Sequence, residues 1–376
     1  MPRTRHAAGL LAVALLVTVT ACDSDGGDGG WGSGSAWSVQ GALAQLPAAA
    51  PDATVLVQAG DLVTASEAAG VERPDDLDSQ ALVDWLGPLT GGPGAEETLV
   101  FVPIASLFNA PRLLQHEEFA DELGFSVLDA EAFVEQSTPP ATFAVVAGDL
   151  DGALRDDLPE VADGVVTAGE GEDLATDVAN QTVARPLGMP LRLAERPGLV
   201  AASPDTTAVA DWVAGPERTL ADHDELGAVA SALDDADVLA AALATGSSMA
   251  LADALGETGS PEQVAALEAD LGAVLPPEPF RTVGIGWGVE DGAADVTIAY
   301  HFGTEDAAES AEPAFEAMFA EGDTLVSRQP LSELLTLDGV DRDGPVVVLD
   351  LSLPDGVGPR VVFDLHVSRD LPFAHR

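Results

Sequence analysis

Three side chains near the C-terminal end are candidates for metal-binding or proton-transfer chemistry. His301, Asp364 and His366 fall in two segments whose apolar residues alternate with a period of two, 296–302 and 360–367. If both segments are strands, these three side chains lie on the polar faces. Neighbouring strands would then bring them together as a metal site or an acid–base site. The competing interpretation places them on a solvated face, or His301 in a hydrogen bond beneath a helix.

The common catalytic signatures are missing from the sequence. It has no Gly-x-Ser-x-Gly elbow in a segment that can fold, no P-loop, no His-Glu-x-x-His and no spaced cysteine ligands. With 64 acidic residues, chance proximity of two carboxylates does not indicate a glycosidase. The sequence therefore predicts no cofactor and leaves the catalytic residues unknown.

The N-terminal segment has the order of an export signal. Arg3 and Arg5 precede an apolar run at residues 7–21, and the only cysteine of the chain, Cys22, follows directly. This order is typical of a secretory signal peptide. The run is shorter than the roughly 20 residues that a transmembrane helix needs. We therefore expect residues 1–21 to be removed rather than to remain as a membrane span.

The tetrapeptide 19–22, Val-Thr-Ala-Cys, resembles the lipobox of bacterial lipoproteins. The resemblance implies that the Cys22 sulfur carries diacylglycerol and that Cys22 becomes the first residue after cleavage. It also implies an exported protein, held by lipid at the outer face of the cytoplasmic membrane. The alternative is an ordinary secretory signal cleaved after Ala21, with Cys22 as a plain thiol. Residues 22–37 are rich in Gly, Ser and Asp, which predicts a flexible tether.

The chain is strongly acidic. It has 64 acidic and 15 basic residues, none of them lysine, and a formal net charge of −49. Without a basic patch to neutralise phosphates, nucleic acid is excluded as a partner. The same charge disfavours electrostatic attachment to anionic lipid, so membrane attachment depends on the acyl chains. Solubility at an exposed surface and adaptation to high salt both explain the acidity, since counterions screen carboxylate repulsion.

The length and an internal repeat predict two domains. We expect residues 38–216 and 217–376 to form two related α+β modules, each a mainly antiparallel sheet covered by helices. Segments 54–62 and 142–150 agree at six of nine positions, and 243–247 is a looser third copy. Each predicts a buried strand, a glycine turn, and an Asp or Ser that caps a following helix. The alternative function for these turns is ligand binding.

Hydrophobic periodicity and turn residues predict the remaining elements. The expected helices are 78–86, 110–123, 129–135, 205–213, 222–233, 247–255, 261–271 and 305–321. The expected strands are 54–59, 98–102, 142–147, 164–168, 191–195, 199–202, 238–244, 283–289, 296–302, 345–353 and 360–367. The last four strands should form an antiparallel sheet with helices on one face.

Glycines and tryptophans in these elements allow two interpretations each. Gly284, Gly286 and Gly288 form a strip without side chains, which suits either a covering helix or a flat ligand. The side chains of Trp85, Trp212 and Trp287 are either core anchors or a sugar-binding platform. In both cases we favour the structural interpretation.

A second resemblance concerns the segment 199–238, which is similar to a pattern in uncharacterised bacterial extracytoplasmic proteins. There, a strand and a short helix lead into the next α+β module, so the resemblance implies a repeat architecture and no activity. The leading hypothesis is a non-enzymatic binding or interaction module whose partner is a small-molecule ligand or an envelope protein. The alternative is a metal-assisted hydrolase of cell-envelope material that uses His301, Asp364 and His366.

Overall fold

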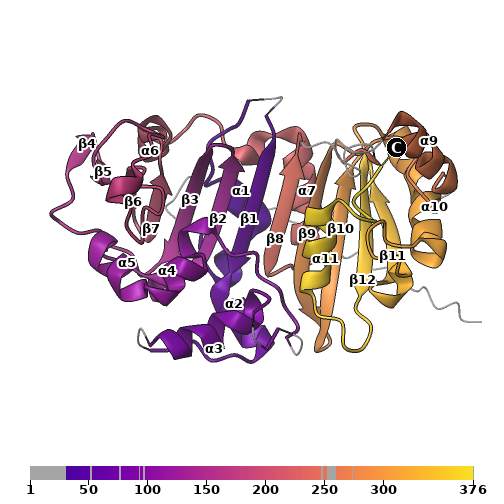
Figure 1. Cartoon of the computed structure of the whole chain (residues 1–376), viewed down its shortest axis with the longest axis horizontal. Helices are drawn as coiled ribbons and strands as arrows, with labels where there is room; N and C mark the ends of the chain where they lie inside the picture. The colour runs from indigo at the N-terminus through magenta and orange to yellow at the C-terminus, as the bar shows by residue number, and fades with distance from the viewer. Residues whose placement is uncertain are drawn as a thin grey trace, which may run out of the picture.

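A single antiparallel sheet of twelve strands runs through the structure (Figure 1). The computed structural model describes residues 31–50, 53–75, 78–92, 94–95, 98–246, 249–251, 260–272 and 274–375. The strand order is β11-β12-β10-β9-β8-β1-β2-β3-β7-β6-β5-β4. Helices lie on both faces of the sheet, which confirms an α+β fold built on antiparallel strands.

The strands of the first half are β1 (Val55–Asp61), β2 (Ala130–Thr138), β3 (Ala141–Gly148), β4 (Glu160–Ala162), β5 (Val165–Ala168), β6 (Leu191–Arg196) and β7 (Leu199–Ser203). Those of the second half are β8 (Ala240–Thr245), β9 (Thr282–Glu290), β10 (Ala293–His301), β11 (Thr336–Asp343) and β12 (Val346–Ser352). The two halves meet where β1 pairs with β8, from Val55 opposite Thr245 to Gly60 opposite Ala240. Both halves therefore contribute to one sheet, instead of building one sheet each.

Two hydrophobic clusters, one on each face of the sheet, hold the helices. One face carries α2 (Leu62–Ala69), α3 (Ser79–Leu89), α4 (Ala110–Leu114), α5 (His116–Leu123), α9 (Pro261–Asp270), α10 (Glu305–Glu321) and α11 (Arg360–Ser368). The opposite face carries α1 (Val39–Leu43), α6 (Thr206–Ala214) and α7 (Asp224–Asp235). Each cluster includes residues from both halves, so the core is continuous across the β1–β8 pair.

Local sequence signals explain several helix starts. Asp61 ends β1 and caps α2, because its carboxylate accepts the backbone N–H groups of Val63 and Thr64 at 3.1 and 3.0 Å. The predicted turn from strand to helix is thus confirmed at Gly60-Asp61. It was wrong at Gly148-Asp149, where β3 is followed by a turn and loop without a helix.

The glycine strip and the tryptophans have structural roles. A Cβ on Gly284 would come within 2.5 Å of Val229 on α7, and one on Gly286 would collide with Val238. The strip therefore lets α7 approach the sheet closely, as the covering-helix interpretation predicts. The three tryptophans Trp85, Trp212 and Trp287 are at most 1% exposed, which confirms them as core anchors.

Three predicted elements were wrong. Residues 129–135 belong largely to strand β2, because a central strand covered on both faces loses the alternation that identifies strands. Residues 98–102 form no strand. Residues 360–367 lie in helix α11, which buries Val362 and Leu365 at a spacing of three rather than along one strand face. The hairpin partner of β12 is instead β11, which was not predicted.

Part of the predicted tether is packed on the fold. Trp31 is buried, the Ser33 hydroxyl donates to Asp61 at 2.8 Å, and the Trp37 indole donates to the Val238 carbonyl at 2.9 Å. The prediction of a flexible tether over residues 22–37 was therefore wrong for residues 31–37. The contacts of Trp31 and Trp37 hold this part of the chain on the fold despite its glycines. The predicted signal peptide 1–21, Cys22, and most of the predicted helix 247–255 lie outside the described residues. Within the described part of the chain, no helix is long and apolar enough to span a membrane.

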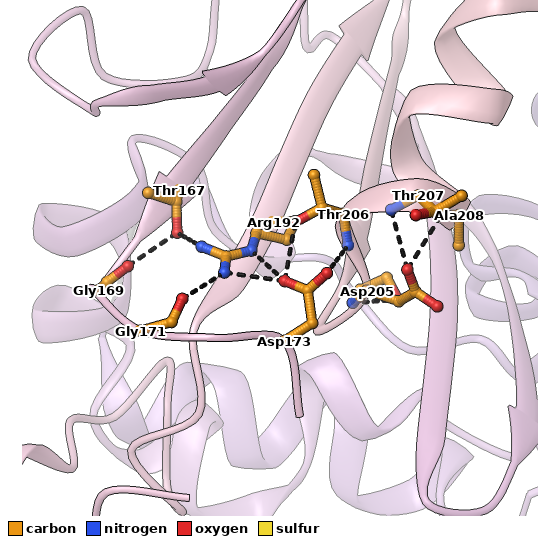
Figure 2. Close-up of polar contacts among 10 residues, drawn as sticks. Thr167, Gly169, Gly171, Asp173, Arg192, Asp205, Thr206, Thr207 and Ala208 are labelled. Atoms are coloured by element: carbon orange, nitrogen blue, oxygen red, sulfur yellow. Dashed lines mark hydrogen bonds and ion pairs between the residues drawn. The ribbon is translucent and has the colours of Figure 1, made fainter. Parts of the chain in front are cut away.

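A buried arginine fastens the loop before β6 to helix α6 (Figure 2). The Arg192 guanidinium donates to Asp173 at 2.9 Å, to the Thr167 hydroxyl at 2.6 Å and to the Gly171 carbonyl at 2.8 Å. Asp173 in turn accepts the backbone N–H and hydroxyl of Thr206 at 2.9 and 2.7 Å. We call these five residues the Arg192 clasp.

Candidate functional site

The structure does not bring the three predicted site residues together. His301 is the last residue of β10. Its neighbour Tyr300 points to the face of the sheet that carries α11, so His301 points to the opposite face, near the start of α7. Asp364 and His366 lie on α11, on the face to which Tyr300 points. Asp364 is exposed and pairs with Arg360 at 3.2 Å. The error follows from taking residues 360–367 as a strand.

His301 lines a polar cavity of about 820 Å³ at the start of α7. Glu225 accepts a hydrogen bond from Thr282 at 3.0 Å and lies 3.7 Å from Arg281 in an ion pair. Burial lowers the pKa of His301, and the charge of Glu225 opposes this shift. His301 is therefore neutral at neutral pH.

The two histidines of this cavity are used by the fold. The Nδ1 of His301 accepts the Gly303 N–H at 3.1 Å, and the Nδ1 of His223 accepts the Leu226 N–H at 3.3 Å, as the cap of α7. Because Nδ1 accepts a hydrogen bond in both rings, the ring proton lies on Nε2. Over the described residues, no group of three or more His, Cys, Asp or Glu side chains is placed to hold a metal ion.

A second cavity, of about 470 Å³, lies across the pairing of the two halves, and we call it the seam cavity. Its floor is the end of the sheet formed by β8, β1, β2 and β3, and one wall is α11. Both polar and apolar residues line it: Thr54, Leu56, Val57, Gln58, Ser106, Glu135, Ser137, Thr142, Ala242, Leu243, Met249, Phe363, His366, Val367 and Arg369. Leu56 and Val367 are 40% and 65% exposed, so they form its rim.

Glu135 is the buried carboxylate of the seam cavity. It lies on β2, is 6% exposed, and accepts the Ser106 N–H at 3.0 Å and the Ser106 hydroxyl at 2.6 Å. Burial raises the pKa of Glu135, and this effect exceeds the opposing effects of the Ser106 hydrogen bonds, of the charge on Arg112 and of a backbone hydrogen bond from Leu107. The carboxylate is therefore held in a site that disfavours its charge.

His366 is the second ionisable group that burial perturbs in this cavity. Burial lowers its pKa to about 4, so the imidazole is neutral at neutral pH. Its Nδ1 is buried and has no hydrogen-bond partner among the described residues. The ring packs edge-to-face on Phe373, with centroids 4.9 Å apart. This nitrogen has almost no exposed surface, so it is an unsatisfied polar atom within the wall of the cavity.

The seam cavity is the better candidate for a functional site. In the His301 cavity the polar groups satisfy one another, whereas the seam cavity combines apolar walls with two ionisable groups whose charged forms are disfavoured. Such a combination is typical of small-molecule sites. Sequence reasoning missed Glu135 because it treated residues 129–135 as a helix. An acidic residue directly after the apolar run 132–134 was the available signal.

Comparison of the chain with protein-family models, with curated proteins and with solved structures gives no match.

Proposed function

We propose that this chain is a lipid-anchored, exported binding protein that holds a small molecule in the seam cavity. The observation that carries the proposal is the cavity itself, with Glu135 buried and His366 half-buried among its walls. The lipobox-like sequence ending at Cys22 supports the anchor and the location at the outer face of the cytoplasmic membrane. Two acyl chains suffice for stable membrane attachment.

The contacts in the seam cavity favour binding over nucleophilic catalysis. The commonest serine nucleophile hydrogen-bonds to a histidine base. Here the Ser106 hydroxyl donates to Glu135, the same carboxylate that accepts the Ser106 N–H, and the Nδ1 of His366 has no partner among the described residues. Ser106 and Glu135 therefore fix each other in place, as suits a preformed ligand site.

We also propose that the two halves are related modules that meet at the seam cavity. From the central pair outward, the first half runs β1-β2-β3-β7-β6-β5-β4 and the second runs β8-β9-β10-β12-β11, so the first five strands of each half follow the same order once the added pair β4 and β5 is set aside. A helix precedes each central strand, α1 before β1 and α7 before β8, and these two helices contact each other. This correspondence supports a boundary near residue 216. In this correspondence β8 is the counterpart of β1, whereas the sequence repeat would make β3 the counterpart of β1.

The anchor is tested by replacing the lipid-bearing sulfur. In the native host, the Cys22→Ser variant should leave the membrane fraction, whereas the control Ser24→Ala should stay in it. Mass spectrometry of the N-terminal peptide of the wild-type protein should show Cys22 as the first residue, with diacylglycerol on its sulfur. An unmodified thiol, or an intact leader, would overturn the proposed location.

The binding site is tested with an uncharged fluorescent probe, N-phenyl-1-naphthylamine, whose emission rises in apolar surroundings. The full mature chain should bind it, and Leu56→Trp at the rim should weaken binding by about tenfold or more by filling the entrance. Val178→Trp is the matched control, because Val178 is also exposed and does not line the cavity. Absence of binding, or equal effects of the two variants, would contradict the proposal.

A further inference from the structure

The seam cavity has a polarity along its depth. Exposed apolar side chains, Leu56 and Val367, lie at the rim, whereas the Glu135 carboxylate is almost fully buried. A molecule that enters therefore meets apolar surface first and an acidic group at the far side. The volume of about 470 Å³ is in the range of ordinary small-molecule sites.

The Glu135 carboxylate has no direct ion pair among the described residues. The guanidinium of Arg112 acts on it only through its charge, because its N–H groups donate to the carbonyls of Ser106, Val183 and Ala184. The hydrogen bonds from Ser106 fix the orientation of the carboxylate but do not neutralise it. A buried carboxylate gains most from a partner that is both a hydrogen-bond donor and a cation.

The other polar groups of the cavity are compatible with such a donor. A neutral His366 has one ring nitrogen that accepts a hydrogen bond, and Gln58 and Ser137 each have an accepting oxygen. Arg369, the basic side chain of the lining, is exposed and lies on the solvent side. The net charge of −49 also attracts cations to the molecule and repels anions.

We infer that the ligand of the seam cavity is an amphipathic amine, whose protonated amino group pairs with Glu135 and whose apolar part lies against the walls near Leu56 and Val367. This inference rests on the proposed binding function and adds the ligand class to it. The Glu135 carboxylate acts as counter-ion and His366 as a neutral acceptor. No bond is made or broken.

The test uses three dansyl probes that differ only at the end of a five-carbon chain. Monodansylcadaverine ends in an ammonium group, N-hexyl dansylamide in a methyl group, and 6-(dansylamino)hexanoic acid in a carboxylate. We expect the mature chain to bind the ammonium probe about tenfold more tightly than the methyl probe, and the carboxylate probe most weakly. Because the pair is buried, the preference should persist in about 0.5 M NaCl.

Glu135→Gln is the decisive variant, because a glutamine oxygen can still accept both hydrogen bonds from Ser106. Its affinity for the methyl probe should be unchanged, while the ammonium preference should fall to a ratio near one. Glu131→Gln removes the same charge from an exposed position on the same strand and should keep the preference.

The outcomes separate the inference from the proposed function. If none of the three probes binds, the small-molecule function itself is contradicted. If the methyl or carboxylate probe binds best, or if Glu135→Gln keeps the full ammonium preference, the amine assignment is wrong and the binding function stands.

Discussion

The Arg192 clasp and the seam cavity both bury charge-bearing side chains, but they treat them in opposite ways. In the clasp, the guanidinium donates from all three of its nitrogens, and Asp173 accepts from both Arg192 and Thr206 (Figure 2). In the seam cavity, Glu135 has no ion pair and the Nδ1 of His366 has no partner among the described residues. A satisfied buried network fixes structure, whereas an incompletely satisfied one retains capacity for a ligand.

The two carboxylates record this difference in their pKa values. Partial burial favours a higher pKa for Asp173, but hydrogen bonds from Thr206 and the pairing with Arg192 outweigh it, so the pKa is lowered. For Glu135, burial outweighs the hydrogen bonds and the pKa is raised. The structure thus favours the charged form of the Asp173 carboxylate and disfavours the charged form of the Glu135 carboxylate.

The largest expected effect comes from breaking the clasp. Arg192→Met should lower the free energy of unfolding by about 3 kcal/mol, because it removes the cation of the pair and leaves the Asp173 carboxylate with its hydrogen bonds from Thr206 alone. Urea denaturation measures the loss. The matched change Arg360→Met breaks an exposed pair with Asp364 and should cost less than about 1 kcal/mol. Equal losses in the two variants would remove the distinction between the clasp and a surface ion pair.

A smaller effect is expected from His366 on acidification. Its folded pKa of about 4 lies below the ordinary value of 6.5, so its contribution to stability is present above pH 6.5 and is lost as the pH falls to 4. Between these two pH values the wild-type protein should lose about 2–3 kcal/mol more than His366→Asn, which does not titrate. Unfolding free energies of both proteins at each pH give the difference, in which the titration of other groups cancels. Parallel pH profiles would show that His366 is not held neutral.

The smallest expected effect is that of Glu135→Gln, and its sign is the informative part. Because the folded pKa of Glu135 is raised, its contribution to stability is present below its unfolded pKa and is lost as the pH rises through the folded value. At neutral pH the variant should therefore equal or exceed the unmodified protein, by up to about 1 kcal/mol. Thermal or urea unfolding at pH 7 measures it. A destabilisation as large as that of Arg192→Met would mean that Glu135 belongs to a structural network, as Asp173 does.

Much of the fold follows from local sequence rules. The helix cap at Asp61 forms as expected, and Asp78 and Asp205 cap the helices expected at 78–86 and 205–213 in the same way, because a carboxylate two or three residues ahead accepts hydrogen bonds from the free N–H groups. The hairpin at Asp291-Gly292 forms because both residues adopt the positive φ that this turn requires. These elements depend on residues within one turn of each other.

The candidate site could not be predicted in the same way. Glu135 and His366 are far apart in the chain, on an element expected to be a helix and an element expected to be a strand. Both errors arose where packing overrides periodicity. β2 is a central strand that helices α2 and α1 cover on opposite faces, and α11 buries Val362 and Leu365 at a helical spacing of three.

The sequence alone determined the acidic composition, the export-like N-terminal segment ending at Cys22, the capped helices and the glycine strip, since each depends on composition or on contacts between near neighbours. Only the tertiary structure decided that twelve strands join in one sheet and that Glu135 faces a cavity shared with α11. The physical reason is that burial sets the state of an ionisable group. Burial depends on which distant segments cover that group, and no local pattern records this.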